Sequence, residues 1–250
     1  MRRQLIWLVL AGLIGALAGA IAQFPAARAV ALVEPAGITL NGVQGTIWRG
    51  SAERISVPQA PPLAAVRWQV SPLALLTGRV AGELRFDVAG GQGESRFAVD
   101  RSGAINVTEA QFRGPANGIA RHVPETMRVE GDITAHVAEA RIADRRPHRV
   151  EGRARWDRAA VRQPLDVELG AVTVAVMPDG NEGHRFTVDA RDGAFDVDGG
   201  GGATVDGRYD LDLRIEPTAQ ASSEMFELLE VFARREDGAF VIRDAGNLPW

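Results

Sequence analysis

Several residue types that carry chemistry in other proteins are missing from this chain of 250 residues. It has no cysteine, which excludes disulfides, CxxC redox centres, iron–sulfur clusters and cysteine zinc sites. It also has no lysine, so every basic residue is an arginine. The arginines alternate with acids along the chain, and the net charge is −4. A nucleic-acid-binding surface needs a concentrated positive patch, so this distribution argues against one.

The motifs of common enzyme classes are missing too. No GxSxG, HExxH or Walker sequence is present. The histidines lack ligand-like spacing, which favours surface positions over a metal site: His122, His136, His148 and His184. The pairs Asp196/Asp198 and Asp210/Asp212 each project from one face of a strand, and a solvated sheet face is the favoured interpretation. We therefore expect no enzymatic activity, no catalytic residue, no cofactor and no bound metal.

Aromatic residues are few, at 6%, whereas glycine is abundant, with 28 residues. This balance is typical of many short strands joined by turns. Four consecutive glycines, Gly199–Gly202, have no helix signal behind them, so a flexible turn is preferred over a phosphate-binding loop.

One long apolar run is present, and it lies at the N-terminus. Leu5 to Ala22 contains 18 residues without a charge, which as a helix reaches about 27 Å, the thickness of a thin bilayer core. Arg2 and Arg3 place the preceding tip in the cytoplasm. We expect residues 1–4 to be a cytoplasmic tip, 5–23 a single transmembrane anchor, 24–36 a linker and 37–250 a periplasmic β domain. A cleavable signal peptide is the alternative, because Ala27-Arg28-Ala29 resembles a cleavage site.

Small residues line faces of the expected anchor. Gly15 and Gly19 form a GxxxG match, with Gly12 and Ala16 on a second small-residue face. Such faces let membrane helices approach closely, so these four residues are candidates for helix packing.

The remainder of the chain alternates apolar and polar residues with period two. Asn41-Gly42 predicts a two-residue hairpin turn, and Val80 to Val88 alternates cleanly. Between them, Ser71 and Pro72 suit the start of a helix and Gly78 suits its end, which predicts one or two helical turns. Ser222 to Arg235 predicts an amphipathic helix, capped by a serine and closed by Arg234 and Arg235. The fold class is thus mainly β, either a long curved antiparallel sheet or two packed β repeats (halves 37–125 and 126–250), with a few short helices.

Two segments carry a family resemblance. The first runs from Leu40 to Ala52 and contains G-x-x-G-T-I-W-x-G-x-A; the second runs from Val66 to Gly78 and contains V-x-W-x-x-x-P-L-x-L-L-x-G. Together they resemble the type II secretion system protein N family, and the stretch ending at Trp156 is similar in layout. The residues that match the motifs, with Trp156 from the second half, are Gly42, Gly45, Thr46, Trp48, Gly50, Ala52, Trp68, Pro72, Leu73, Leu76, Gly78 and Trp156.

The resemblance implies an accessory inner-membrane component of the type II secretion system. Such a protein contributes to export of folded periplasmic proteins across the outer membrane through contacts with other inner-membrane and periplasmic components. A rival interpretation is a membrane-anchored periplasmic β-groove protein that binds or transfers lipid. The apolar rows around Val80 to Val88 and Leu165 to Val176 would line such a groove.

Overall fold

The computed structural model of the chain describes residues 25–28, 37–56, 61–118, 128–144, 146–163, 166–180 and 183–247. The expected anchor at 5–23, with its packing residues Gly12, Gly15, Ala16 and Gly19, lies outside the described residues. Over the described ranges, no helix combines the length and the apolar character needed to cross a membrane.

The chain divides into two compact units, one ending at Asp87 and one beginning at Val88. Every strand ladder within each unit is antiparallel. The prediction of a mainly β protein with a few short helices is confirmed. The unit boundary differs from the expected repeat boundary at 125/126, and the duplication stays a prediction.

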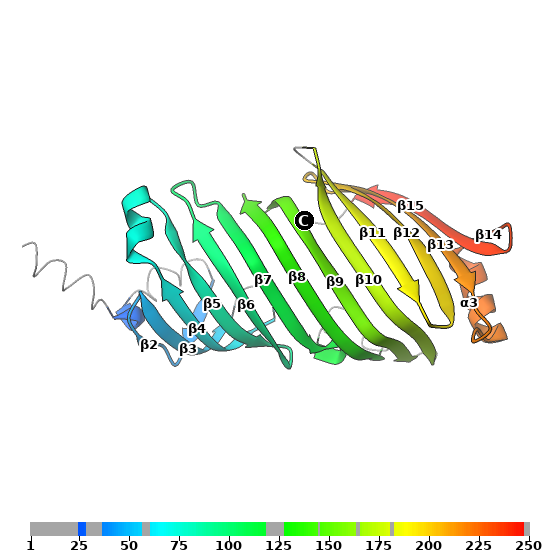
Figure 1. Cartoon of the computed structure of the whole chain (residues 1–250), viewed down its shortest axis with the longest axis horizontal. Coiled ribbons are helices and arrows are strands. Elements are labelled where there is room, and N and C mark those ends of the chain that lie inside the picture. Colours follow the sequence, from blue (N-terminus) through cyan, green and yellow to red (C-terminus); the bar gives the residue numbers. More distant parts are fainter. Residues whose placement is uncertain are drawn as a thin grey trace, which may run out of the picture. The chain divides into compact units, whose positions relative to one another are not determined.

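Within the first unit the strand order is β1-β3-β4-β5, and β2 also pairs with β3; β2, β3, β4 and β5 are labelled in Figure 1. Its elements are β1 (Thr39–Asn41), β2 (Gln44–Gly45), β3 (Arg49–Ser56), β4 (Leu63–Val70), the 3-10 helix η2 (Pro72–Thr77) and β5 (Val80–Val88). Ser71 precedes the helix, Pro72 occupies its first turn and Gly78 ends it in the left-handed conformation, as the sequence predicts.

The predicted hairpin at Asn41-Gly42 is wrong. β1 and β2 do not pair with each other; both pair with β3, at Leu40↔Ile55 and Gly45↔Gly50. A type I′ hairpin turn needs a positive φ at both central residues, and only Gly42 has one, at +65°. The chain therefore bends at Gly42 and continues along the same partner strand.

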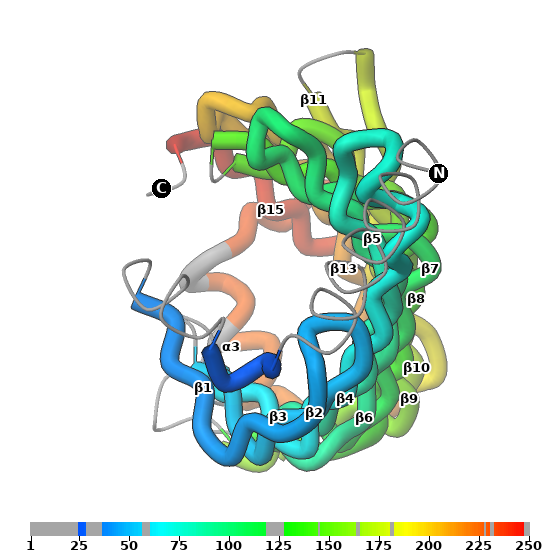
Figure 2. Tube along the Cα trace, turned by 90° about the vertical axis from the view of Figure 1, so that its left-hand side faces the viewer, coloured from blue at the N-terminus to red at the C-terminus, as the bar shows by residue number. Residues whose placement is uncertain are grey.

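Within the second unit the strand order is β6-β7-β8-β9-β10-β11-β12-β13-β15-β14. Figure 2 shows that its long strands are bent along their length. The strands are β6 (Gly91–Val99), β7 (Ile105–Pro115), β8 (Arg128–Ala143), β9 (Arg146–Gln163), β10 (Val167–Asp179), β11 (Gly183–Arg191), β12 (Phe195–Thr204), β13 (Arg208–Pro217), β14 (Arg234–Glu236) and β15 (Ala239–Asn247), with helix α3 (Ser223–Phe232) between β13 and β14.

Alternation along these strands places apolar side chains on one face. The cross-strand register aligns them in rows, of which one runs Ile133, Trp156, Val172, Ala190, Val197, Ile215 and Phe240. The fully enclosed part of this face lies beside α3, where Ala194, Phe195, Ile215 and Phe240 are buried against Met225, Phe226 and Leu229. The core of the second unit is therefore concentrated at its C-terminal end.

The predicted helix from Ser222 to Arg235 is confirmed in place but shorter, ending at Phe232. Arg234 and Arg235 belong to β14 instead of the last helical turn. The turn Asp237-Gly238, with φ of 50° and 82°, folds Arg234 to Glu236 back onto Ala239 to Val241. Hairpin pairing thus overrides the favourable position of a cation at a helix end.

The glycine run Gly199–Gly202 does not form the predicted turn but lies inside β12. A Cβ atom added at Gly201 would lie 1.9 Å from the Asp210 carbonyl oxygen and 2.8 Å from Cζ of Phe186. One at Gly200 would lie 2.2 Å from the Phe186 carbonyl oxygen. The glycines are needed because neighbouring strands and an aromatic ring occupy the space of their missing side chains.

Candidate functional site

The two motif segments of the sequence meet across one pair of strands. Gly50 lies directly opposite Trp68, and Ala52 lies opposite Val66 in the β3–β4 ladder. Ala52 is 2% exposed and Val66 is fully buried. The two motifs therefore form a single cluster in the first unit.

The cluster is organised around the turn that precedes β3. The Thr46 N–H donates to the Arg49 carbonyl oxygen at 2.9 Å, and the Thr46 hydroxyl accepts from the Arg49 N–H at 3.1 Å. A Cβ atom at Gly45 would lie 2.5 Å from that same Arg49 oxygen. Threonine and glycine are thus both needed to close this turn, which supports a structural role for Thr46.

Trp68 covers the backbone of the neighbouring strand. A Cβ atom at Gly50 would lie 2.4 Å from Cζ2 of Trp68, so the indole occupies the space that glycine leaves. The Trp68 indole N–H donates to the Thr46 carbonyl oxygen at 3.3 Å. Trp48 is buried, and its carbonyl oxygen accepts from the Val70 N–H at 2.7 Å. The motif tryptophans therefore pack and bond within the unit.

The proline–leucine part of the motif points outward. η2 follows β4 directly, and the Ser71 N–H donates to the Ala81 carbonyl oxygen at 2.8 Å. Leu73 is 74% exposed and Leu76 is 83% exposed. In contrast to the tryptophans, these two leucines are mostly exposed, so their side chains are not buried within the unit.

A second tryptophan–glycine pair lies in the second unit. The indole N–H of Trp156 on β9 donates to the Glu130 carbonyl oxygen at 2.8 Å. A Cβ atom at Gly131 on β8 would lie 2.7 Å from the Trp156 Nε1. Trp156 thus relates to its neighbouring strand much as Trp68 does, although the sequence alone does not bring Gly131 beside it.

The polar face of the second unit carries a series of arginine–carboxylate pairs. Arg162 contacts Glu130, Asp166 and Glu168, and these acids raise the pKa of its guanidinium group. Further pairs are Arg149–Glu139, Arg155–Asp157, Arg185–Asp179, Arg191–Asp189 and Arg214–Glu216. In each of these pairs a carboxylate lies beside the guanidinium group, so the charges of the named arginines are offset locally.

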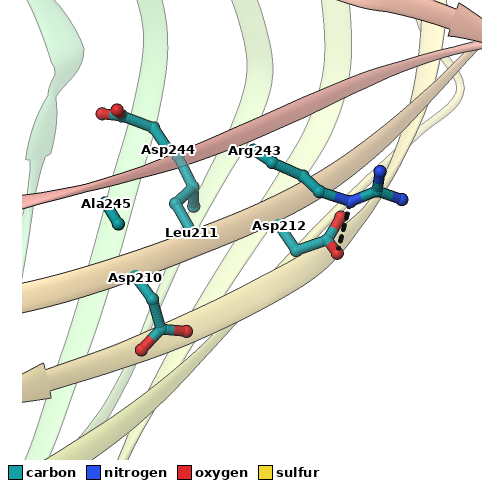
Figure 3. Close-up of a pocket in the computed structure, with 6 residues that line it drawn as sticks. All are labelled: Asp210, Leu211, Asp212, Arg243, Asp244 and Ala245. Atoms are coloured by element: carbon teal, nitrogen blue, oxygen red, sulfur yellow. Dashed lines mark hydrogen bonds and ion pairs between the residues drawn. The ribbon is translucent and has the colours of Figure 1, made fainter.

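The second aspartate pair singled out in the sequence, Asp210/Asp212, borders a shallow open depression between β13 and β15 (Figure 3). Asp210 is exposed, and Asp212 is paired with Arg243 at 3.2 Å. Asp244 accepts a hydrogen bond from the Tyr209 hydroxyl at 2.7 Å, which raises the pKa of that tyrosine. The pairs Asp212–Arg243 and Tyr209–Asp244 lie at the surface, as expected for a solvated sheet face.

Among the described histidines, His184 departs furthest from the expected surface position. His184 is only 8% exposed, and its Nε2 has no hydrogen-bond partner among the described residues. Burial, with a smaller contribution from the charge of His148, lowers the pKa of His184. The described part of the chain contains no group of three or more residues able to hold a metal ion.

Most of the β body matches one family model. That model describes type II secretion system (T2SS) protein N and aligns with residues 36–243. The chain belongs to the type II secretion system protein N family. The resemblance carried by the two motifs is thereby confirmed, and family membership associates the chain with type II secretion and protein transport.

A curated relative supports the same family. Type II secretion system protein N of Vibrio cholerae serotype O1 (strain ATCC 39315 / El Tor Inaba N16961) is 25% identical over 143 residues. The match covers 55% of this chain and 56% of the relative, so the chain spans a little over half the length of that protein. No solved structure matches this protein N family member. Membership gives coarse support to the expectation that the chain is not an enzyme.

Proposed function

We propose that this chain is an accessory component of the type II secretion system that is anchored in the inner membrane by residues 5–23. Its β body, residues 37–250, would lie in the periplasm and act by contact with other secretion components. The match of the protein N family model to residues 36–243 carries this proposal, because it covers nearly the whole body that follows the apolar segment. The comparisons do not favour the lipid-handling alternative.

The chemistry of the motif cluster is consistent with a role in contact. Its tryptophans and glycines pack against backbone, and its carbonyl and hydroxyl groups bond within the unit. No nucleophile–base pair stands among these motif residues. The exposed leucines of η2 are side chains of the kind that bury apolar area against another surface.

Deletion of the gene in the host tests the role in secretion. We expect folded substrates of the type II pathway to accumulate in the periplasm and to decrease in the medium, with recovery when the full chain is restored. Unchanged secretion, together with no cross-link to another type II secretion component, would contradict the proposal. Because the chain has no cysteine, single-cysteine variants allow such cross-links to be assigned to one position.

Membrane topology is tested separately. Alkaline phosphatase fused after Asn247 should be active, because that enzyme matures only outside the cytoplasm. The intact chain should stay with the membrane after alkaline carbonate extraction, whereas a chain lacking residues 5–23 should be released. An inactive fusion, or release of the intact chain, would rule out the anchored periplasmic arrangement.

A further inference from the structure

Exposed apolar side chains are concentrated at one place in the described residues. Seven large hydrophobic side chains are exposed among the described residues, and four of them lie between Leu73 and Val80. They are Leu73 at 74%, Leu75 at 43%, Leu76 at 83% and Val80 at 41%. Scattered single exposures need no explanation, but four within one short segment mark an interaction surface. We refer to these four residues as the η2 patch.

The strand order shows which end of the first unit carries the η2 patch. β3 begins at Arg49, and antiparallel pairing places Arg49 opposite Gln69 near the end of β4. The Val70 N–H reaches the Trp48 carbonyl oxygen at 2.7 Å, two residues before η2 begins. The turn at Thr46 to Arg49 and η2 therefore lie at the same end of the strands.

The chain that leaves the N-terminal apolar segment arrives at this same end. Pro25 forms an isolated antiparallel bridge with Thr46, and Ala26 is 5% exposed. In sequence, Pro25 comes three residues after Ala22, the last residue of the uncharged run. If that run spans the bilayer, three residues reach at most about 10 Å, so the membrane surface lies close to Thr46.

Charge at this end matches an anionic lipid surface. The segments 25–28, 46–49 and 69–83 contain Arg28, Arg49 and Arg79, all exposed, against a single acid, Glu83. Apolar side chains flanked by arginines suit the boundary between lipid headgroups and acyl chains, where the leucines enter and the guanidinium groups meet phosphates. A protein partner would require no excess of one charge sign at this end.

We propose that the η2 patch inserts into the surface of the bilayer beside the anchor, as a second membrane contact that fixes the orientation of the first unit. This inference rests on the proposed anchor at residues 5–23. It assigns the outward-facing Leu73 and Leu76 of the family motif to lipid, whereas Trp48, Trp68 and Gly50 hold the turn and strands that present them.

The test uses the full chain in vesicles of phosphatidylethanolamine and phosphatidylglycerol. A cysteine introduced as Leu76→Cys carries an environment-sensitive fluorophore, and no other cysteine competes for the label. The matched control is Thr39→Cys, an exposed position that pairs with Ser56. Ser56 and Arg49 are the two ends of β3, which are about 25 Å apart. We expect brominated lipids to quench the label at position 76 at least twofold and to leave the label at position 39 unchanged.

Two further arms separate insertion from attraction of the fluorophore itself. Adding Leu73→Asp to the Leu76→Cys variant should return quenching to the level of position 39, because a carboxylate resists entry into the bilayer. Replacing phosphatidylglycerol by phosphatidylcholine should reduce quenching at position 76, because the arginines lose their anionic partners.

The outcomes distinguish failure of the η2 inference from failure of the proposed anchor. A label at position 76 that is no more quenched than the label at position 39, in a chain that resists carbonate extraction, overturns the η2 inference alone. A chain that carbonate releases from the vesicles overturns the anchor and the inference together. Quenching that persists with Leu73→Asp also counts against insertion of the η2 patch.

Discussion

In the first unit the indole of Trp68 lies over Gly50, and in the second the indole of Trp156 lies over Gly131. Each indole N–H donates to a backbone carbonyl oxygen, that of Thr46 in one case and that of Glu130 in the other. The backbones differ. Gly50 sits in regular pairing, whereas Gly131 has a φ of +113° and lies between the pairs Glu130↔Ala160 and Asp132↔Asp157, where the register shifts.

The two tryptophans make the same kind of contact although the backbones beneath them differ. The same coverage of a neighbouring strand occurs on a regular ladder and on a bulge, so the bulge is not required for it. An aromatic ring laid over a glycine shields the backbone of the neighbouring strand and adds packing area to the sheet. Both tryptophan–glycine pairs are therefore explained by shielding of the backbone at the glycine, and neither requires a ligand-binding role.

The largest effect is expected at the bulged site. Gly131→Ala should destabilise the second unit by roughly 4 kcal/mol, combining strain at a positive φ with overpacking against carbonyl oxygens of Asp157 and Arg158 at 2.5 and 2.6 Å. Gly50→Ala carries no φ strain and should cost about 2 kcal/mol in the first unit. Hydrogen exchange of the detergent-solubilised full chain, compared between β8–β9 and β3–β4 peptides, measures both. Equal losses would show that the bulge adds no strain.

The next effect concerns coupling between ring and glycine. Trp68→Ala should cost roughly 3 kcal/mol through lost packing and the lost indole hydrogen bond. With Trp68 removed, Gly50→Ala should cost about 1 kcal/mol less than in the parent chain, because the Trp68 Cζ2 contact at 2.4 Å is gone. In the second unit Trp156→Ala should rescue Gly131→Ala less, since backbone oxygens still crowd that position. Additive losses at Gly50 and Trp68 in a double-mutant cycle of urea unfolding would refute the ring-over-glycine account.

The smallest expected effect is a difference between the two units in how their stability depends on pH. All four histidines lie beyond Asp87, so the first unit contains none. The pKa of buried His184 is lowered on folding, so protons bind the unfolded chain more readily as the pH falls below about 6.5. Stability associated with this group is therefore full above that pH and decreases as the pH falls toward the folded pKa.

Hydrogen exchange should accordingly show weaker protection of β11 peptides at pH 5.5 than at pH 7, beyond any change in β3–β4. His184→Gln serves as the control variant, because it removes the titrating group while keeping a polar side chain. The excess loss should shrink in that variant. If the parent and His184→Gln lose protection equally, His184 does not contribute to the acid sensitivity of the second unit.

Particular residues show which elements of the fold the local sequence pattern predicts correctly. The alternation of Val80 to Val88 correctly predicts β5, and Ser71-Pro72 with Gly78 correctly predicts the bounds of η2. The pattern failed where a choice depended on a distant strand. Asn41-Gly42 has hairpin chemistry, yet β3 pairs with both flanking segments, and Gly199–Gly202 has turn chemistry, yet Phe186 and the β13 backbone hold it in a strand.

The candidate site was found only in part by the same means. The motif residues could be named from their resemblance to a family, but the opposition of Gly50 and Trp68 depends on the register of β3 and β4. The pairing of Trp156 with Gly131 was missed, although a glycine 25 residues before a tryptophan in adjoining alternating segments was the available signal. The buried position of His184 had no local signal at all.

By itself, the sequence of this protein determined a mainly β body, a short helix after β4 and the protein N family, because alternation, caps and motif residues act over a few neighbours. Only the tertiary structure decided which strands pair, where glycines make room for aromatic rings, and that Leu73 and Leu76 stay exposed at the end of the strands where Pro25 pairs with Thr46. Those outcomes depend on register between segments far apart in the chain, and register is set by the packing of whole strands.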